Sequence, residues 1–100
     1  MAADNQLSKL YNQIALRIIA GQANIVGDWA FEIAEAVPGL ALLTGKTLEV
    51  NLTAEPKTVI NTLIAKYVSL FGRMAHDVCK DLVSDLVPDM RSEDIPERLN

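Results

Sequence analysis

Apolar residues recur at helical spacing through the second half of the chain, over residues 57–87. Successive members are three or four residues apart, about 3.7 on average, which keeps them on one face of a nearly straight helix. Thr53 suits an N-cap and Pro88 a stop, so the pattern predicts a single helix over 54–87. Gly72 lies inside this segment, but the stripe stays in phase on both sides of it. The stripe contains Ile60, Ile64, Tyr67, Phe71, Ala75, Val78, Leu82 and Leu86.

A second stripe occupies the first third of the chain and predicts a helix over residues 5–37. Its members are Leu7, Tyr11, Ile14, Ile18, Ile25, Trp29, Ile33 and Val37. Gly21 and Gly27 each cost about 1 kcal/mol relative to Ala inside a helix, so a break near residues 21–24 is the alternative. Pro38 and Gly39 then end the helical pattern.

The pattern changes to a period of two between these segments. Residues 47–53 alternate polar and apolar side chains, which is typical of a half-buried strand. Gly45 and Lys46 suit a two-residue turn, so residues 40–53 are predicted to form a β-hairpin. An extended connector is the alternative interpretation.

Two helices of about 50 Å joined by a short link favour an antiparallel pair in a mainly α fold. Each helix has a wider apolar face than one neighbour covers, so we expect two chains to form a dimeric four-helix bundle. A break in the first helix would instead allow a monomeric three-helix bundle. The candidate core and interface residues are Ile60, Ile64, Tyr67, Phe71, Val78, Leu82, Ile25, Trp29 and Ile33.

The composition supports one small helical domain over residues 1–100. Half of the residues are apolar, and a domain of this size leaves part of such surface for an interface. The net charge of −4 falls entirely in residues 81–100, because Lys and Arg balance Asp and Glu before them. A neutral body with an acidic tail at 88–100, either flexible or docked, predicts no nucleic-acid partner. No apolar run approaches the roughly 18 residues of a membrane span, so no membrane partner is expected either.

His76 is the candidate phosphoacceptor, because Arg73 and Lys80 lie one helical turn away and could hold a phosphate. The residues after it lack the Lys-Gly pair usual in histidine phosphotransfer domains. With Cys79, His76 offers two metal ligands, which do not make a site. No metal or cofactor is therefore predicted.

Four aromatic residues could line a pocket for an apolar ligand, namely Trp29, Phe31, Tyr67 and Phe71. If the two helices run antiparallel, Glu32 and Glu35 could pair with Lys66 or Arg73. Asp81, Asp85 and Asp89 follow at four-residue spacing, where like charges repel. We interpret this acidic series as a solvated helix end.

These patterns favour a non-enzymatic helical module for oligomerisation or protein interaction, serving as a regulatory or scaffold subunit. Its expected partner is a second copy of itself, in a homodimer, or another helical protein. A lone Cys79 cannot form an internal disulfide, so a cytoplasmic location is expected. The alternatives are a sensor of small apolar ligands and a phosphotransfer protein that uses His76.

Overall fold

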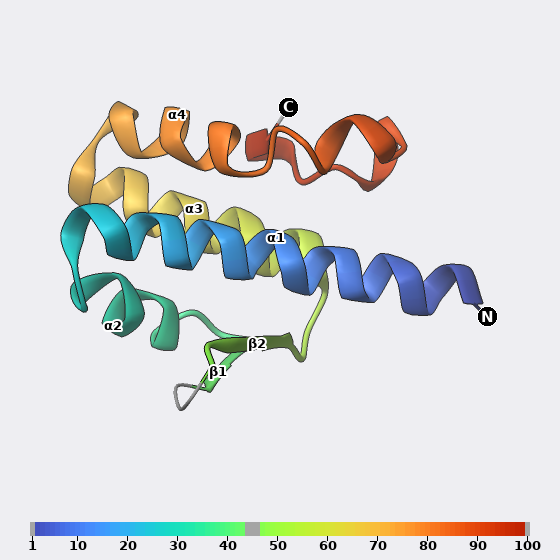
Figure 1. Ribbon diagram of the computed structural model, residues 1–100, viewed down its shortest axis with the longest axis horizontal. Helices are drawn as coiled ribbons and strands as arrows, with labels where there is room; N and C mark the ends of the chain where they lie inside the picture. The colour runs from blue at the N-terminus through green and yellow to red at the C-terminus, as the bar shows by residue number, and fades with distance from the viewer. Residues whose placement is uncertain (1, 44–46, 100) are drawn as a thin grey trace.

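The computed structural model describes residues 2–43 and 47–99, and side chains from residue 6 onward. It is mainly helical with one small antiparallel sheet, as predicted. The long helix α1 crosses the molecule, α3 lies behind it, α4 lies on one side, and α2 with the hairpin lies on the other (Figure 1). The elements in chain order are α1 (Ala2–Val26), α2 (Trp29–Glu35), β1 (Leu40–Leu43), β2 (Glu49–Leu52), α3 (Pro56–Phe71), α4 (Arg73–Leu82) and three short 3-10 turns (Val87–Asp89, Ser92–Asp94 and Glu97–Leu99).

The first predicted helix is broken, but not at residues 21–24. It ends at Val26, and α2 begins at Trp29 after Gly27, whose φ of 73° is rarely open to other residues. Gly21 stays helical because α4 packs closely against α1 there. A Cβ at position 21 would lie 2.3 Å from a methyl carbon of Leu82.

The prediction of one helix over 54–87 is wrong. Helix α3 ends at Phe71 and α4 begins at Arg73, with Gly72 between them at φ 82° and ψ −169°. The chain reverses at this residue, so α4 runs back along α3 (Figure 1). Helix α4 then ends at Leu82, well before Pro88. Folding back lets both halves of the stripe face α1 within one chain.

The predicted β-hairpin is confirmed. Strands β1 and β2 are antiparallel, with Leu40 opposite Leu52 and Leu42 opposite Val50. The side-chain oxygen of Asn12 on α1 accepts a hydrogen bond of 3.0 Å from the backbone N–H of Leu52, which ties the hairpin to the helices. The predicted turn at Gly45 and Lys46 lies outside the described residues.

The core is built mainly from α1 and α3, α2 and α4 each add a few buried residues, and the acidic tail docks on it. Leu99 and Pro96 are buried, and the hydroxyl of Tyr11 donates a hydrogen bond of 2.6 Å to the carbonyl of Asp94. One chain therefore buries much of both stripes by itself, and the dimeric four-helix bundle is not confirmed. Within residues 2–43 and 47–99, no helix is long and apolar enough to cross a membrane.

Candidate functional site

Large apolar side chains are exposed at the end of the molecule where α1 and α3 finish and α2 and α4 begin. Ile25 is 63% exposed, Trp29 58%, Leu70 55% and Met74 77%. Each comes from a different helix terminus, and these termini lie together in Figure 1. We call the surface formed by these four residues the apolar end. Leu43, 60% exposed, is on the hairpin and not part of it.

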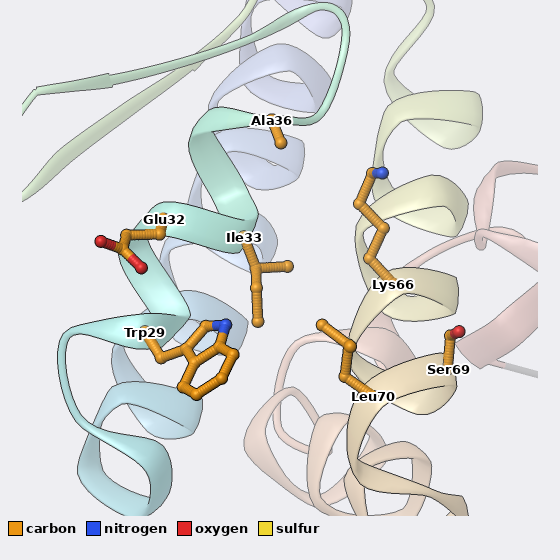
Figure 2. Close-up of a pocket in the computed structure, with 7 residues that line it drawn as sticks. All are labelled: Trp29, Glu32, Ile33, Ala36, Lys66, Ser69 and Leu70. Carbon is orange, nitrogen blue, oxygen red and sulfur yellow. The ribbon is translucent and has the colours of Figure 1, made fainter.

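One groove of the apolar end runs between α2 and α3 and has a volume of about 390 Å³. Figure 2 shows Trp29 and Ile33 reaching toward it from α2, and Leu70 facing them from α3. Glu32 and Lys66 lie on opposite walls, with Ala36 and Ser69 completing the lining. The groove therefore has an apolar middle and oppositely charged sides.

A second, smaller pocket has a volume of about 200 Å³. It lies between α1 and α4, and its mostly apolar lining consists of Gln22, Ile25, Val26, Phe71, Met74, Ala75 and Val78. Ile25 and Met74 form its exposed rim. The apolar end is thus a surface with two depressions.

Two buried polar side chains fix the helices beneath this surface. The hydroxyl of Tyr67 donates a hydrogen bond of 2.9 Å to the carbonyl of Ala30, which joins α3 to α2. The amide of Gln22 donates to the carbonyl of Ala75 at 3.2 Å and to Sγ of Cys79 at 3.4 Å, which joins α1 to α4. Burial raises the pKa of Tyr67, and it raises the pKa of the Cys79 thiol to about 11. Both groups are therefore neutral structural contacts.

The four aromatic residues predicted to form a ligand pocket occupy different settings. Trp29 lines the groove between α2 and α3, whereas Phe71 lines the pocket between α1 and α4. Tyr67 is fully buried in the core, and Phe31 is partly buried against it. The structure does not bring the four together around one cavity.

His76, the candidate phosphoacceptor, contacts the C-terminal segment. Its Nε2 lies 2.6 Å from the carbonyl oxygen of Arg98, which can only accept, so this nitrogen carries the proton and donates. The contact holds the last 3-10 turn on α4. Among residues 2–43 and 47–99, no group of three His, Cys, Asp or Glu side chains is placed to hold a metal ion.

The remaining core and interface candidates divide between the interior and the surface. Ile33, Ile60 and Ile64 are buried, while Val78 and Leu82 are half-buried. Ile25 and Trp29, from the same predicted set, are exposed. Leu70 and Met74 were missed because they lie off the predicted stripe. The sequence signal that could have indicated them is that each is an apolar residue outside the stripe, two positions from Gly72.

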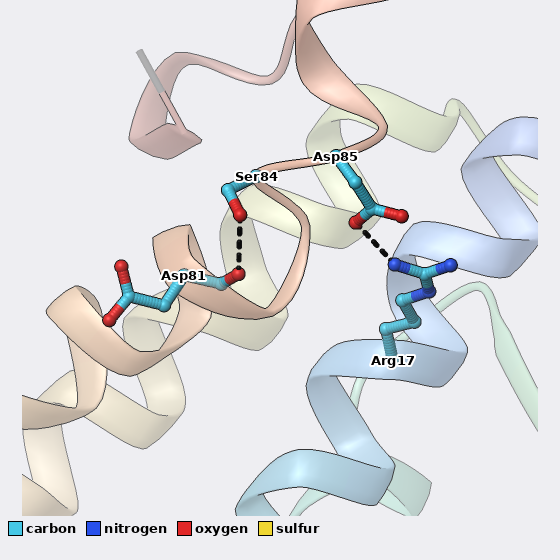
Figure 3. Close-up of polar contacts among 4 residues, drawn as sticks. All are labelled: Arg17, Asp81, Ser84 and Asp85. Atoms are coloured by element: carbon cyan, nitrogen blue, oxygen red, sulfur yellow. Dashed lines mark hydrogen bonds and ion pairs between the residues drawn. The ribbon is translucent and has the colours of Figure 1, made fainter.

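The acidic series at the end of α4 does not form one helical row, because α4 ends before Asp85. Arg17 of α1 donates to the Asp85 carboxylate, and Ser84 donates a hydrogen bond of 2.9 Å to the backbone carbonyl of Asp81 (Figure 3). The hydrogen bond from Arg17 lowers the pKa of Asp85 below its ordinary value. Asp85 thus uses its carboxylate to contact α1, whereas Asp81 contributes its backbone carbonyl to the turn that leaves α4.

The acidic side chains of α2 form no ion pair across the groove. In the part of the chain that the structure describes, the salt bridges are Arg17–Asp85 and Arg91–Glu93. The predicted pairing of Glu32 or Glu35 with Lys66 or Arg73 is thus not formed within the single chain.

Comparisons with known proteins give no assignment for this surface. No protein-family model matches the chain, and no curated protein or solved structure matches it. The chemistry of the apolar end is therefore argued from its own residues.

Proposed function

We propose that this chain is a non-enzymatic protein-interaction module that joins a regulatory or scaffold assembly through its apolar end. The observation that carries the proposal is the gathering of four exposed apolar side chains from four helix termini. Single exposed apolar residues are ordinary on a protein surface, but contiguous ones mark sites of association. The partner is a second copy of the chain or another helical protein.

The residue types of the apolar end suit protein recognition. Trp29 offers a large and rigid contact area of the kind that dominates binding energy at interfaces. Met74 is flexible and adapts to an irregular partner surface. Glu32 and Lys66 supply a charged rim, which interfaces place around an apolar centre. Tyr67 and Gln22 hold the helices beneath in place, which lowers the entropic cost of binding.

The reactive side chains of the chain support a non-enzymatic role. The Cys79 thiol is buried with its pKa raised to about 11, so at neutral pH it is not the thiolate that nucleophilic catalysis needs. His76 uses its Nε2 to hold a backbone carbonyl. A buried thiol also suits the reducing cytoplasm, where we place the protein.

Paired surface variants test the proposal. The protein is purified under native conditions with its partners, and the mass of the intact complex is measured. We expect the parent chain in a complex larger than one chain, and we expect the double substitution L70D/M74D to release it. L43D is the matched control, because Leu43 is equally exposed but lies on the hairpin.

Thermal unfolding of both variants separates lost binding from lost folding, since exposed positions change stability little. A parent chain that is always recovered alone would contradict the proposal. Equal complex formation by the parent and by folded L70D/M74D would contradict the assignment of the apolar end.

A further inference from the structure

We propose that the groove between α2 and α3 binds a second copy of the same chain, with α2 of each copy lying over α3 of the other. The proposal rests on the function given above, because it names the partner of the apolar end and the register of the contact. It is carried by the distribution of charge along the two helices that form the groove.

The walls of the groove carry opposite charges. Helix α2 contains Glu32 and Glu35 but no basic residue, and Asp28 precedes it. Helix α3 contains Lys57 and Lys66 but no acidic residue. Glu32 and Lys66 are the charged residues that line the groove, one on each wall. Neither has an ion-pair partner among the described residues of its own chain.

A two-fold interface is self-complementary, so each wall must fit some wall of the other copy. A two-fold axis parallel to the groove places α2 against α3 of the partner, which brings Glu32 to Lys66 twice. An axis across the groove places α2 against α2, which brings Glu32 and Glu35 of both copies together. Like charges in contact oppose binding, so the charge pattern selects the first arrangement.

The apolar middle of the groove fits the same arrangement. Figure 2 shows Trp29 and Leu70 facing each other at the same level along the groove, one from each wall. When α2 of one copy covers α3 of the other, each Trp29 lies over the partner's Leu70. Two side chains that are 58% and 55% exposed in the single chain then cover each other. The charged pairs flank this apolar contact.

Charge reversal tests the pairing. Self-association of the parent is measured by sedimentation from micromolar to about millimolar concentration. We expect E32K and K66E each to weaken it about tenfold or more, because each places two like-charged contacts in the symmetric interface. An equimolar mixture of the two variants, or the double variant E32K/K66E, should associate within about threefold of the parent, because both restore two opposite-charge pairs. Glu49→Lys, on the hairpin, is the control for the change in net charge.

Trp29 supplies a second readout, since it is the only tryptophan in the chain. Its emission should shift to shorter wavelength as the parent associates, and in E32K the same shift should need about tenfold or more higher protein concentration. A parent that is monomeric throughout would overturn this inference, while a complex with another protein would leave the proposed function standing. If the mixture of variants binds no better than either alone, the register is wrong. If E32K binds more tightly than the parent, α2 faces α2 and the proposed arrangement is also overturned.

Discussion

Substitution of Gly72 by Ala tests the reversal between α3 and α4. Gly72 has φ 82° and ψ −169°, a backbone region occupied essentially by glycine alone. A Cβ at this position would meet no atom within 4 Å, so no steric clash with the rest of the molecule contributes to the change in stability. The effect of the substitution therefore comes from the backbone of residue 72 itself.

The expected magnitude follows from two opposing contributions. Holding Ala in this backbone region costs about 1–3 kcal/mol. Ala also lowers the conformational entropy of the unfolded chain, which stabilises the folded state by about 0.4–1 kcal/mol. We therefore expect the free energy of unfolding to fall by about 1.3 kcal/mol, within a range of about 0–2.6 kcal/mol, and the melting temperature to drop by roughly 5–10 °C at the middle of that range. In an unbroken helix over 54–87, the same substitution would instead raise stability by about 1 kcal/mol.

Urea unfolding followed by far-ultraviolet circular dichroism measures this difference. Ser69→Ala is the matched control, because Ser69 is exposed near the end of α3 and should change stability by less than about 0.5 kcal/mol. Because the two backbone conformations predict opposite signs, the result does not depend on an accurate magnitude. A G72A variant more stable than the parent would refute the reversal at this residue.

Three further predictions concern contacts elsewhere in the fold. Gly39→Ala should cost more than about 2 kcal/mol in urea unfolding, because φ is 82° and the new Cβ would lie 2.6 Å from the Cβ of Ala54. Tyr67→Phe should cost about 1 kcal/mol by the same measurement, since it removes a buried hydrogen bond of 2.9 Å between α3 and α2. The ion pair of Arg17 with Asp85 lowers the pKa of Asp85, so its contribution is present above the ordinary pKa of Asp and is lost as pH falls through the lowered value. As the pH is lowered through that acidic range, the melting temperature of Arg17→Ala should accordingly decrease less than that of the parent.

The sequence was sufficient to predict the type of each main element but not where the helices break. A period of two located the hairpin, and apolar spacing of three or four located both helical segments. The stripe on either side of Gly72 stays in phase, so the pattern describes a straight helix and a reversed pair equally well. Gly21 and Gly27 look alike in sequence, yet only Gly27 breaks the helix. The difference is tertiary, because Leu82 packs against the space above Gly21.

The candidate site was predicted in part. Ile25 and Trp29 belonged to the predicted core and interface stripe, and both are exposed at the apolar end. Leu70 and Met74 flank that stripe without belonging to it, so apolar spacing does not single them out. The proximity of Met74 to Ile25 of α1 depends on the reversal at Gly72, which apolar spacing alone does not encode.

This dependence links the two central tests. Met74 lies two residues after Gly72 and reaches Ile25 because the chain turns back there. G72A should lose stability and keep association, because the strained backbone still holds the reversed arrangement in the folded protein. L70D/M74D should lose association alone, because the helices beneath are still held by the buried hydrogen bonds of Tyr67 and Gln22. If folded L70D/M74D associates as tightly as the parent, the apolar end is not the binding surface, whatever the stability of G72A.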